Sequence, residues 1–145
     1  MIIIMRTKIV TLCFAFSLFG FSFIYAQQTT EKDGKPSVLH TPLSKEDAHT
    51  VLEKIQNKDA ILVDVRTPEE YNEGHLKFST NIDVNADDFK SQISKLDKSK
   101  TIYLYCLSGN RSAKASDILK TLGFKAAFSI GGFEDLKVAG LPVQK

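Results

Sequence analysis

Short continuous runs of apolar residues alternate along the chain with segments whose apolar residues recur every three or four positions. The continuous runs predict strands that are covered on both faces of a sheet. The run of this kind lies at 60–65, and further strands are predicted at 81–84, 101–105 and 126–130. The helical spacing predicts helices with one apolar face. These lie at 44–57, 86–96 and 112–122.

Residues with strong positional preferences mark several helix ends. Ser44 suits the N-cap of the first helix, because Asp47 follows three residues later in a near match to a capping box. Pro68 fits the first turn of a short helix over 68–73, which Gly74 closes. The two glycines at 131–132 predict a turn into a last helical piece.

The alternation of strands and helices predicts the fold class. It is typical of an α/β domain with three layers, in which helices flank both faces of a central, mainly parallel sheet. We expect this domain to occupy residues 44–145. The preceding residues 27–43 are polar and contain glycine and proline, which predicts a flexible leader.

The first 26 residues have a different character. Residues 1–8 carry two bases and no acid, residues 9–24 are almost wholly apolar, and Ala26 precedes a polar stretch. This pattern predicts a secretory signal peptide over 1–26. The alternative is a membrane anchor that is not removed, for which the apolar stretch is short. We therefore expect an exported protein, periplasmic or secreted, that does not bind a membrane once the signal is removed.

Loss of this segment changes the charge and the cysteine count. The 19 basic residues fall to 17 without Arg6 and Lys8, which equals the 17 acidic residues. A neutral domain gives no electrostatic reason to expect nucleic acid or an anionic membrane as a partner. Cys13 is also lost, so Cys106 stands alone. A solitary cysteine in an exported domain indicates intermolecular pairing or reactivity, and we expect a monomer with a reactive thiol.

Two strand exits carry the candidate chemistry. Asp64 and Arg66 follow one strand, and residues 106–111 follow another. Ligands of parallel sheets bind beyond the carboxyl ends of the strands, so both exits should open on one rim. The loop leads straight into a helix, whose unpaired amides can converge on the Cys106 thiolate and lower its pKa. Gly109 would permit the tight curl, and Arg111 would add a cation.

Each of these residues also has a structural interpretation. Cys106 could be an inert buried thiol, and Arg111 could be a solvated helix residue. Arg66 could pair with Asp64, which we interpret as structural, bonding nearby loop amides. His75 is more typical of a packing residue than of a base. No cluster of metal ligands stands out in the sequence, so we expect no metal site.

The chain resembles the rhodanese family of sulfurtransferases from about residue 44 to residue 143. The resembling segments are Ile61–Arg66, Glu70-Tyr71, Gly74–Leu76, Asn81-Ile82, Tyr103–Cys106, Gly109–Ser112, Gly131-Gly132 and Ala139–Val143. The resemblance implies that Cys106 takes a sulfane sulfur from a donor such as thiosulfate and passes the persulfide sulfur to cyanide or a thiol. It also implies that the loop residues Leu107, Ser108, Gly109, Asn110 and Arg111 bind the sulfur and the donor, with Arg66 as a further donor ligand. No cofactor is implied.

The chain departs from the family pattern at three places. The family usually continues after Leu76 with a Pro-Gly-Ala turn, where this chain has Lys77-Phe78-Ser79. Leu136 lies near the place of a common tryptophan. Leu107 and Ser108 stand where a positive residue is common, which puts thiosulfate in question as the donor.

Three other functions remain as alternatives. A cysteine phosphatase or arsenate reductase loop has one residue more between cysteine and arginine than the four residues found here. A thioredoxin-like exchanger would need a second cysteine two residues away, and the loop has none. A non-catalytic binding module often lacks the cysteine or the arginine, and this chain keeps both.

Overall fold

The computed structural model describes residues 43–145. The signal peptide predicted over 1–26 and nearly all of the leader predicted over 27–43 lie outside these residues. The elements in chain order are α1 (Lys45–Gln56), β1 (Ala60–Asp64), α2 (Pro68–Glu73), β2 (His75–Leu76), β3 (Ser79–Asn81), α3 (Phe89–Ile93), β4 (Thr101–Cys106), α4 (Asn110–Thr121), β5 (Ala127–Gly132), α5 (Phe133–Val138) and β6 (Val143–Gln144).

The central sheet has the strand order β3-β1-β4-β5, and every neighbouring pair in it is parallel. In this register Asp64 at the end of β1 lies beside Tyr105 near the end of β4. The two exits predicted to carry the chemistry therefore open on the same rim, as expected for parallel neighbours.

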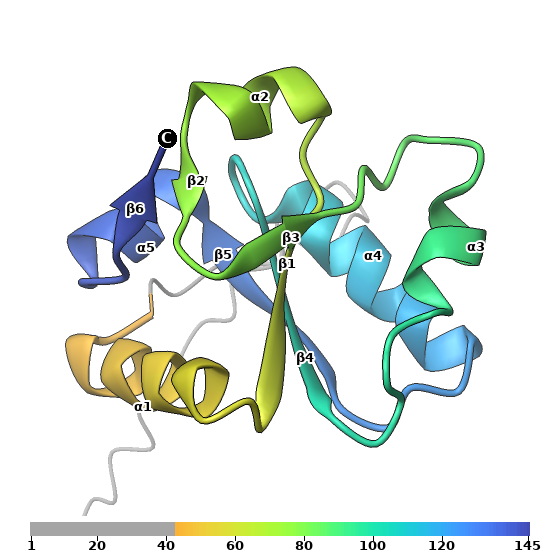
Figure 1. The fold of residues 1–145 in the computed structure, drawn as a ribbon, viewed down its shortest axis with the longest axis horizontal. Helices are drawn as coiled ribbons and strands as arrows, with labels where there is room; N and C mark the ends of the chain where they lie inside the picture. Colours follow the sequence, from red (N-terminus) through yellow and green to blue (C-terminus); the bar gives the residue numbers. More distant parts are fainter. Residues whose placement is uncertain (1–42) are drawn as a thin grey trace, which may run out of the picture. The chain divides into compact units, whose positions relative to one another are not determined.

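Helices cover both faces of this sheet, which confirms the predicted three-layer α/β fold. Side chains alternate along β4, so Tyr103 and Tyr105 pack in one hydrophobic cluster with α1 and α5. Leu104 and Cys106 point to the opposite face and pack in a second cluster with α3 and α4. Figure 1 shows α1 and α5 on one side of the sheet and α3 and α4 on the other.

The predicted caps are present. Asp47 donates its backbone N–H to the Ser44 hydroxyl at 3.1 Å, at the start of α1. Helix α2 begins with Pro68 behind a complete capping box of Thr67 and Glu70, and Gly74 follows its last turn.

Two predicted elements are shorter than expected. The strand predicted at 81–84 is observed as β3 over Ser79–Asn81. Ile82 and Val84 are buried, but the Asp83 carboxylate accepts the Asn85 N–H at 2.9 Å in a turn, which ends the extended segment. The helix predicted over 86–96 is reduced to α3, Phe89–Ile93, because turns occupy the residues on either side.

Two elements were not predicted at all. Strands β2 and β6 form a separate antiparallel pair, with His75 beside Gln144 and Leu76 beside Val143. Each has two residues, which is too short for a periodic pattern. This pair places the C-terminal residues close to the exit of α2. Within residues 43–145, no helix is both long enough and apolar enough to span a bilayer.

Candidate active site

Cys106 lies at the end of β4, and α4 begins four residues later at Asn110. Its sulfur accepts the backbone N–H of Gly109 at 3.0 Å. Gly109 is the N-cap of α4 and has φ +91°, in the left-handed region that favours glycine. The curled loop and the amide directed at the sulfur are therefore those expected from the sequence.

The environment of Cys106 favours its ionised form. Burial raises the pKa of the thiol, but the amide and hydroxyl of Ser112 and the amides of Ser108 and Gly109 lower it, and the resulting pKa lies below the ordinary value for cysteine. Cys106 has no solvent-exposed surface and packs in the hydrophobic cluster on the α3 and α4 face of the sheet. The site therefore combines a covered sulfur with several donors that stabilise negative charge on it.

Ser112 is a site residue that the sequence analysis missed. It is fully buried in the first turn of α4. Its hydroxyl donates to the carbonyl of Gly109 at 2.9 Å and lies 2.7 Å from the Ser129 hydroxyl. A hydroxyl in the first turn of a helix that follows a nucleophile is the signal that could have identified it.

Arg111 was predicted to add a cation, and the structure gives that cation a partner. Its guanidinium donates two hydrogen bonds to the Glu70 carboxylate, at 2.6 and 2.7 Å. Both side chains are 27% exposed. The pair lowers the pKa of Glu70 to about 2, chiefly through the Arg111 hydrogen bonds. The sequence analysis did not identify Glu70 as part of the site.

Arg66 was predicted as a donor ligand, with a structural ion pair as the alternative. The observed contacts are those of the ion pair. The guanidinium donates to both oxygens of the buried Asp64 carboxylate at 2.7–3.0 Å and to the carbonyl of Gly74 at 2.8 Å. It also lies over the Phe133 ring, and Arg66 as a whole is 3% exposed.

Asp64 was predicted to be structural and to bond nearby loop amides. Besides the guanidinium, its carboxylate accepts the backbone N–H of Arg66 at 2.9 Å. This contact holds the turn of the chain at the exit of β1, and the Val65 N–H, which donates to the Tyr105 carbonyl at 3.0 Å, joins that exit to β4.

A cavity of about 340 Å³ opens beside the loop. Its wall includes the apolar side chains Leu107, Phe133 and Val143 and the charged side chains Glu70, Glu73 and Lys137. Leu107 is 54% exposed. Cys106 itself does not line this cavity; we call the cavity the mouth of the site because Leu107, which lines it, directly follows Cys106 in the chain.

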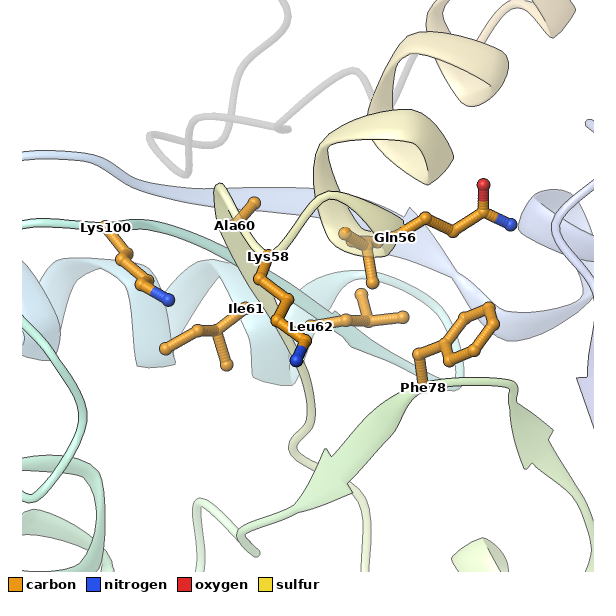
Figure 2. A pocket seen from close by; sticks show the side chains of 8 residues that line it. Gln56, Lys58, Ala60, Ile61, Leu62, Phe78 and Lys100 are labelled. Atoms are coloured by element: carbon orange, nitrogen blue, oxygen red, sulfur yellow. The ribbon is translucent and has the colours of Figure 1, made fainter.

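A larger cavity, of about 470 Å³, is shown in Figure 2. It lies at the amino ends of β1 and β4, where Ala60 and Lys100 contribute to its wall. Figure 2 shows Phe78 and Lys100 on opposite sides of Ile61 and Leu62. Its lining contains no cysteine, and Cys106 lies at the opposite, carboxyl end of β4. Among residues 43–145, no three His, Cys, Asp or Glu side chains are grouped to hold a metal ion.

Known proteins resemble this chain in sequence and in fold. The family described as "Rhodanese-like domain" matches residues 47–139. The Escherichia coli thiosulfate sulfurtransferase PspE is 31% identical over 74 residues, which cover 51% of this chain and 71% of PspE. A solved structure described as "rhodanese with anions from E. coli" has a TM-score of 0.52 and 29% identity, covering 59% of this chain and 98% of that one.

A third relative has a different printed activity. A tRNA uridine(34) hydroxylase from Pelagibacter ubique is 42% identical over 79 residues, which cover 54% of this chain. The match covers only 26% of the hydroxylase. The chain therefore spans about a quarter of the length of this relative.

Proposed function

Because the chain belongs to the rhodanese-like domain family, we propose that it is a sulfurtransferase that works through a persulfide on Cys106. The observation that carries this proposal is the Gly109 amide held 3.0 Å from the Cys106 sulfur at the start of α4. The lowered pKa of the thiol increases the thiolate fraction near neutral pH. PspE, which covers the same domain, is named a thiosulfate sulfurtransferase.

The reaction has two steps. In the first, the Cys106 thiolate attacks the outer sulfur of a donor such as thiosulfate. A bond forms between the two sulfurs, the bond inside the donor breaks, and sulfite leaves with the electron pair. In the second, cyanide or a thiolate attacks the outer sulfur of the persulfide and restores the Cys106 thiolate, with thiocyanate or a new persulfide as product. Both steps balance without a cofactor, and kinetics should be of the ping-pong type.

The loop supplies the binding groups. The backbone amides from Leu107 to Arg111 hold the negatively charged persulfide, and the hydroxyl of Ser112 stabilises the same charge. Arg111 is bound to Glu70, whose side chain lines the mouth. Arg66 acts indirectly, by fixing the exit of β1 through its pair with Asp64.

The test is intact mass after incubation with a sulfane donor. The wild-type chain should gain one sulfur, about 32 Da, which reductant or cyanide removes, and Cys106→Ser should gain none. Failure of the wild type with thiosulfate and with organic persulfides would favour a non-catalytic binding module. Release of phosphate from an aryl phosphate that depends on Cys106 would favour a cysteine phosphatase.

We also propose that the protein is exported and acts as a monomer on small-molecule donors. The basic, apolar and small-residue pattern of residues 1–26 supports export. The mass of the N-terminal peptide of the protein purified from its own cell envelope tests this, since cleavage after Ala26 would leave Gln27 first.

A further inference from the structure

We propose that Glu70 determines the donor specificity of this site: by pairing with Arg111 it disfavours small inorganic dianions and favours an organic persulfide. This inference rests on the sulfurtransferase function proposed above, and it names the class of donor.

The carboxylate is held against Arg111 from two sides. Glu70 is at the third position of α2, and its Oε2 accepts the Thr67 N–H at 3.0 Å as part of the capping box. The same Oε2 accepts Nη1 of Arg111 at 2.6 Å, and Oε1 accepts Nη2 at 2.7 Å. Because the cap fixes the carboxylate from the α2 side, an incoming anion must displace a group that is already anchored. In Figure 1, α2 lies over the end of the sheet from which β4 leads into α4.

The rest of the mouth provides no excess of positive charge. Its lining contains three basic and three acidic residues, namely Arg66, Lys137, Lys145, Glu70, Glu73 and Glu134. Arg66 is bound to Asp64, and Lys137 lies 2.8 Å from Glu134. A dianion that approaches a thiolate requires compensating cations, and Arg111 and two of the three basic residues of the mouth already have carboxylate partners.

The size and apolar wall of the mouth point to an organic donor. Its volume of about 340 Å³ lies within the range of about 300–1,000 Å³ found for organic ligands. Leu107 and Val143 are 54% and 42% exposed, and both line this cavity. They offer contact to the carbon group of a persulfide, and thiosulfate has no carbon to fill that space.

The step remains balanced with such a donor. The Cys106 thiolate attacks the outer sulfur of R–S–SH, a sulfur–sulfur bond forms to Cys106, and the bond inside the donor breaks. The group R–S leaves with the electron pair as a thiolate and takes up the proton that the outer sulfur loses, which gives R–SH and leaves the persulfide anion on the enzyme.

The test compares two donors on the full chain by rapid quench and intact mass. Thiosulfate is the dianion, and benzyl persulfide carries an apolar group. In the wild type, benzyl persulfide should load Cys106 at least about tenfold faster than thiosulfate. Glu70→Gln keeps a side chain that completes the capping box, and its thiosulfate rate should rise about tenfold, the value of one charge-assisted hydrogen bond. Its benzyl persulfide rate should change less than about twofold, since that donor gains nothing from the freed charge.

The matched control is Glu69→Gln, which removes one negative charge from the same turn of α2 at a residue that does not line the mouth. It should leave the ratio of the two rates unchanged. A second measurement uses salt on the same two proteins: the wild-type thiosulfate rate should depend weakly on ionic strength, and that of Glu70→Gln strongly.

The outcomes separate the two proposals. If no donor loads the wild type, the sulfurtransferase function itself is wrong. If donors load it but Glu70→Gln leaves the ratio unchanged or slows both donors equally, Glu70 is structural and the specificity proposal fails. A steep loss of the wild-type thiosulfate rate with added salt would also overturn it.

Discussion

Gly132 is the register partner of Cys106, and a β-carbon on Gly132 would lie 2.7 Å from the carbonyl oxygen of Leu107. The same β-carbon would lie 3.3 Å from Cα of Ser108. The end of β5 therefore forms the wall against which the loop after Cys106 packs. The close approach of two backbones explains why glycine is needed here although its φ of −95° is open to any residue.

Gly132→Ala should impair catalysis more than stability. The added methyl group must push the Leu107 carbonyl away, which shifts the Ser108 and Gly109 amides from the sulfur. We expect the rate of persulfide formation to fall about 10- to 100-fold, and the free energy of unfolding to fall by about 1–3 kcal/mol. Loading kinetics and denaturant unfolding measure the two effects.

Gly123→Ala is the control for this substitution. Gly123 also has a positive φ, +87°, but a β-carbon there would contact nothing within 4 Å. It should lose about 1 kcal/mol of stability through backbone strain and retain its loading rate. If Gly132→Ala formed the persulfide as fast as Gly123→Ala, the loop would tolerate displacement of the Leu107 carbonyl.

Ser112→Ala should raise the pKa of Cys106. Burial of the thiol raises its pKa, and the Ser112 hydroxyl is one of the groups that outweigh this effect. Without the hydroxyl, thiolate formation should require higher pH, so the midpoint of the pH–rate profile of loading should move upward. The ultraviolet absorbance of the thiolate, titrated in wild type and variant with Cys106→Ser as the blank, measures the shift. Equal midpoints would mean that the amides alone set the pKa.

The local parts of the site were predictable from the sequence because they depend on neighbours along the chain. Cys106, the turn at Gly109 and the helix after it lie within a few residues of each other. Glycine favours the left-handed turn, and the start of a helix leaves backbone amides free to bind the sulfur. The apolar runs predicted the sheet because parallel strands are buried on both faces. Asp64 could be identified in the same way, because it lies at the exit of a predicted buried strand.

Two kinds of feature could not be predicted from the sequence. The first is contact between residues far apart in the chain, and the second is a turn where a strand was expected. Glu70 and Arg111 are 41 positions apart, and the capping pattern of Glu70 gave no indication that its carboxylate also faces another helix. Ile82 and Val84 are buried, but burial does not require strand pairing. The Asp83 carboxylate accepts the Asn85 N–H and so stabilises a turn, and this turn takes the place of further strand pairing.

The Glu70–Arg111 pair should make stability depend on acidic pH. Arg111 lowers the pKa of Glu70 from 4.5 to about 2 in the folded state, so the unfolded chain binds more protons between these values. The contribution is complete above about pH 4.5 and is lost as the pH falls toward 2. We expect about 1–2 kcal/mol after allowance for solvent screening. Unfolding of wild type and Glu70→Gln at several pH values should show a difference that disappears near pH 2; a constant difference would contradict it.

Phe78 should be a position where glycine increases stability. It has φ +72°, in the left-handed region, and is 47% exposed; it stands where the related family usually has the glycine of a Pro-Gly-Ala turn. A non-glycine residue in this conformation costs about 1–2 kcal/mol, which exceeds the entropy of about 0.5–1 kcal/mol that glycine adds to the unfolded chain. Phe78→Gly should therefore raise the free energy of unfolding by about 0.5–1 kcal/mol, measured by denaturant titration. Phe78→Ala keeps the β-carbon and the strain and should bring no gain. If alanine stabilised the protein as much as glycine, the exposed Phe78 ring, and not the backbone conformation, would be what lowers the free energy of unfolding in the wild type.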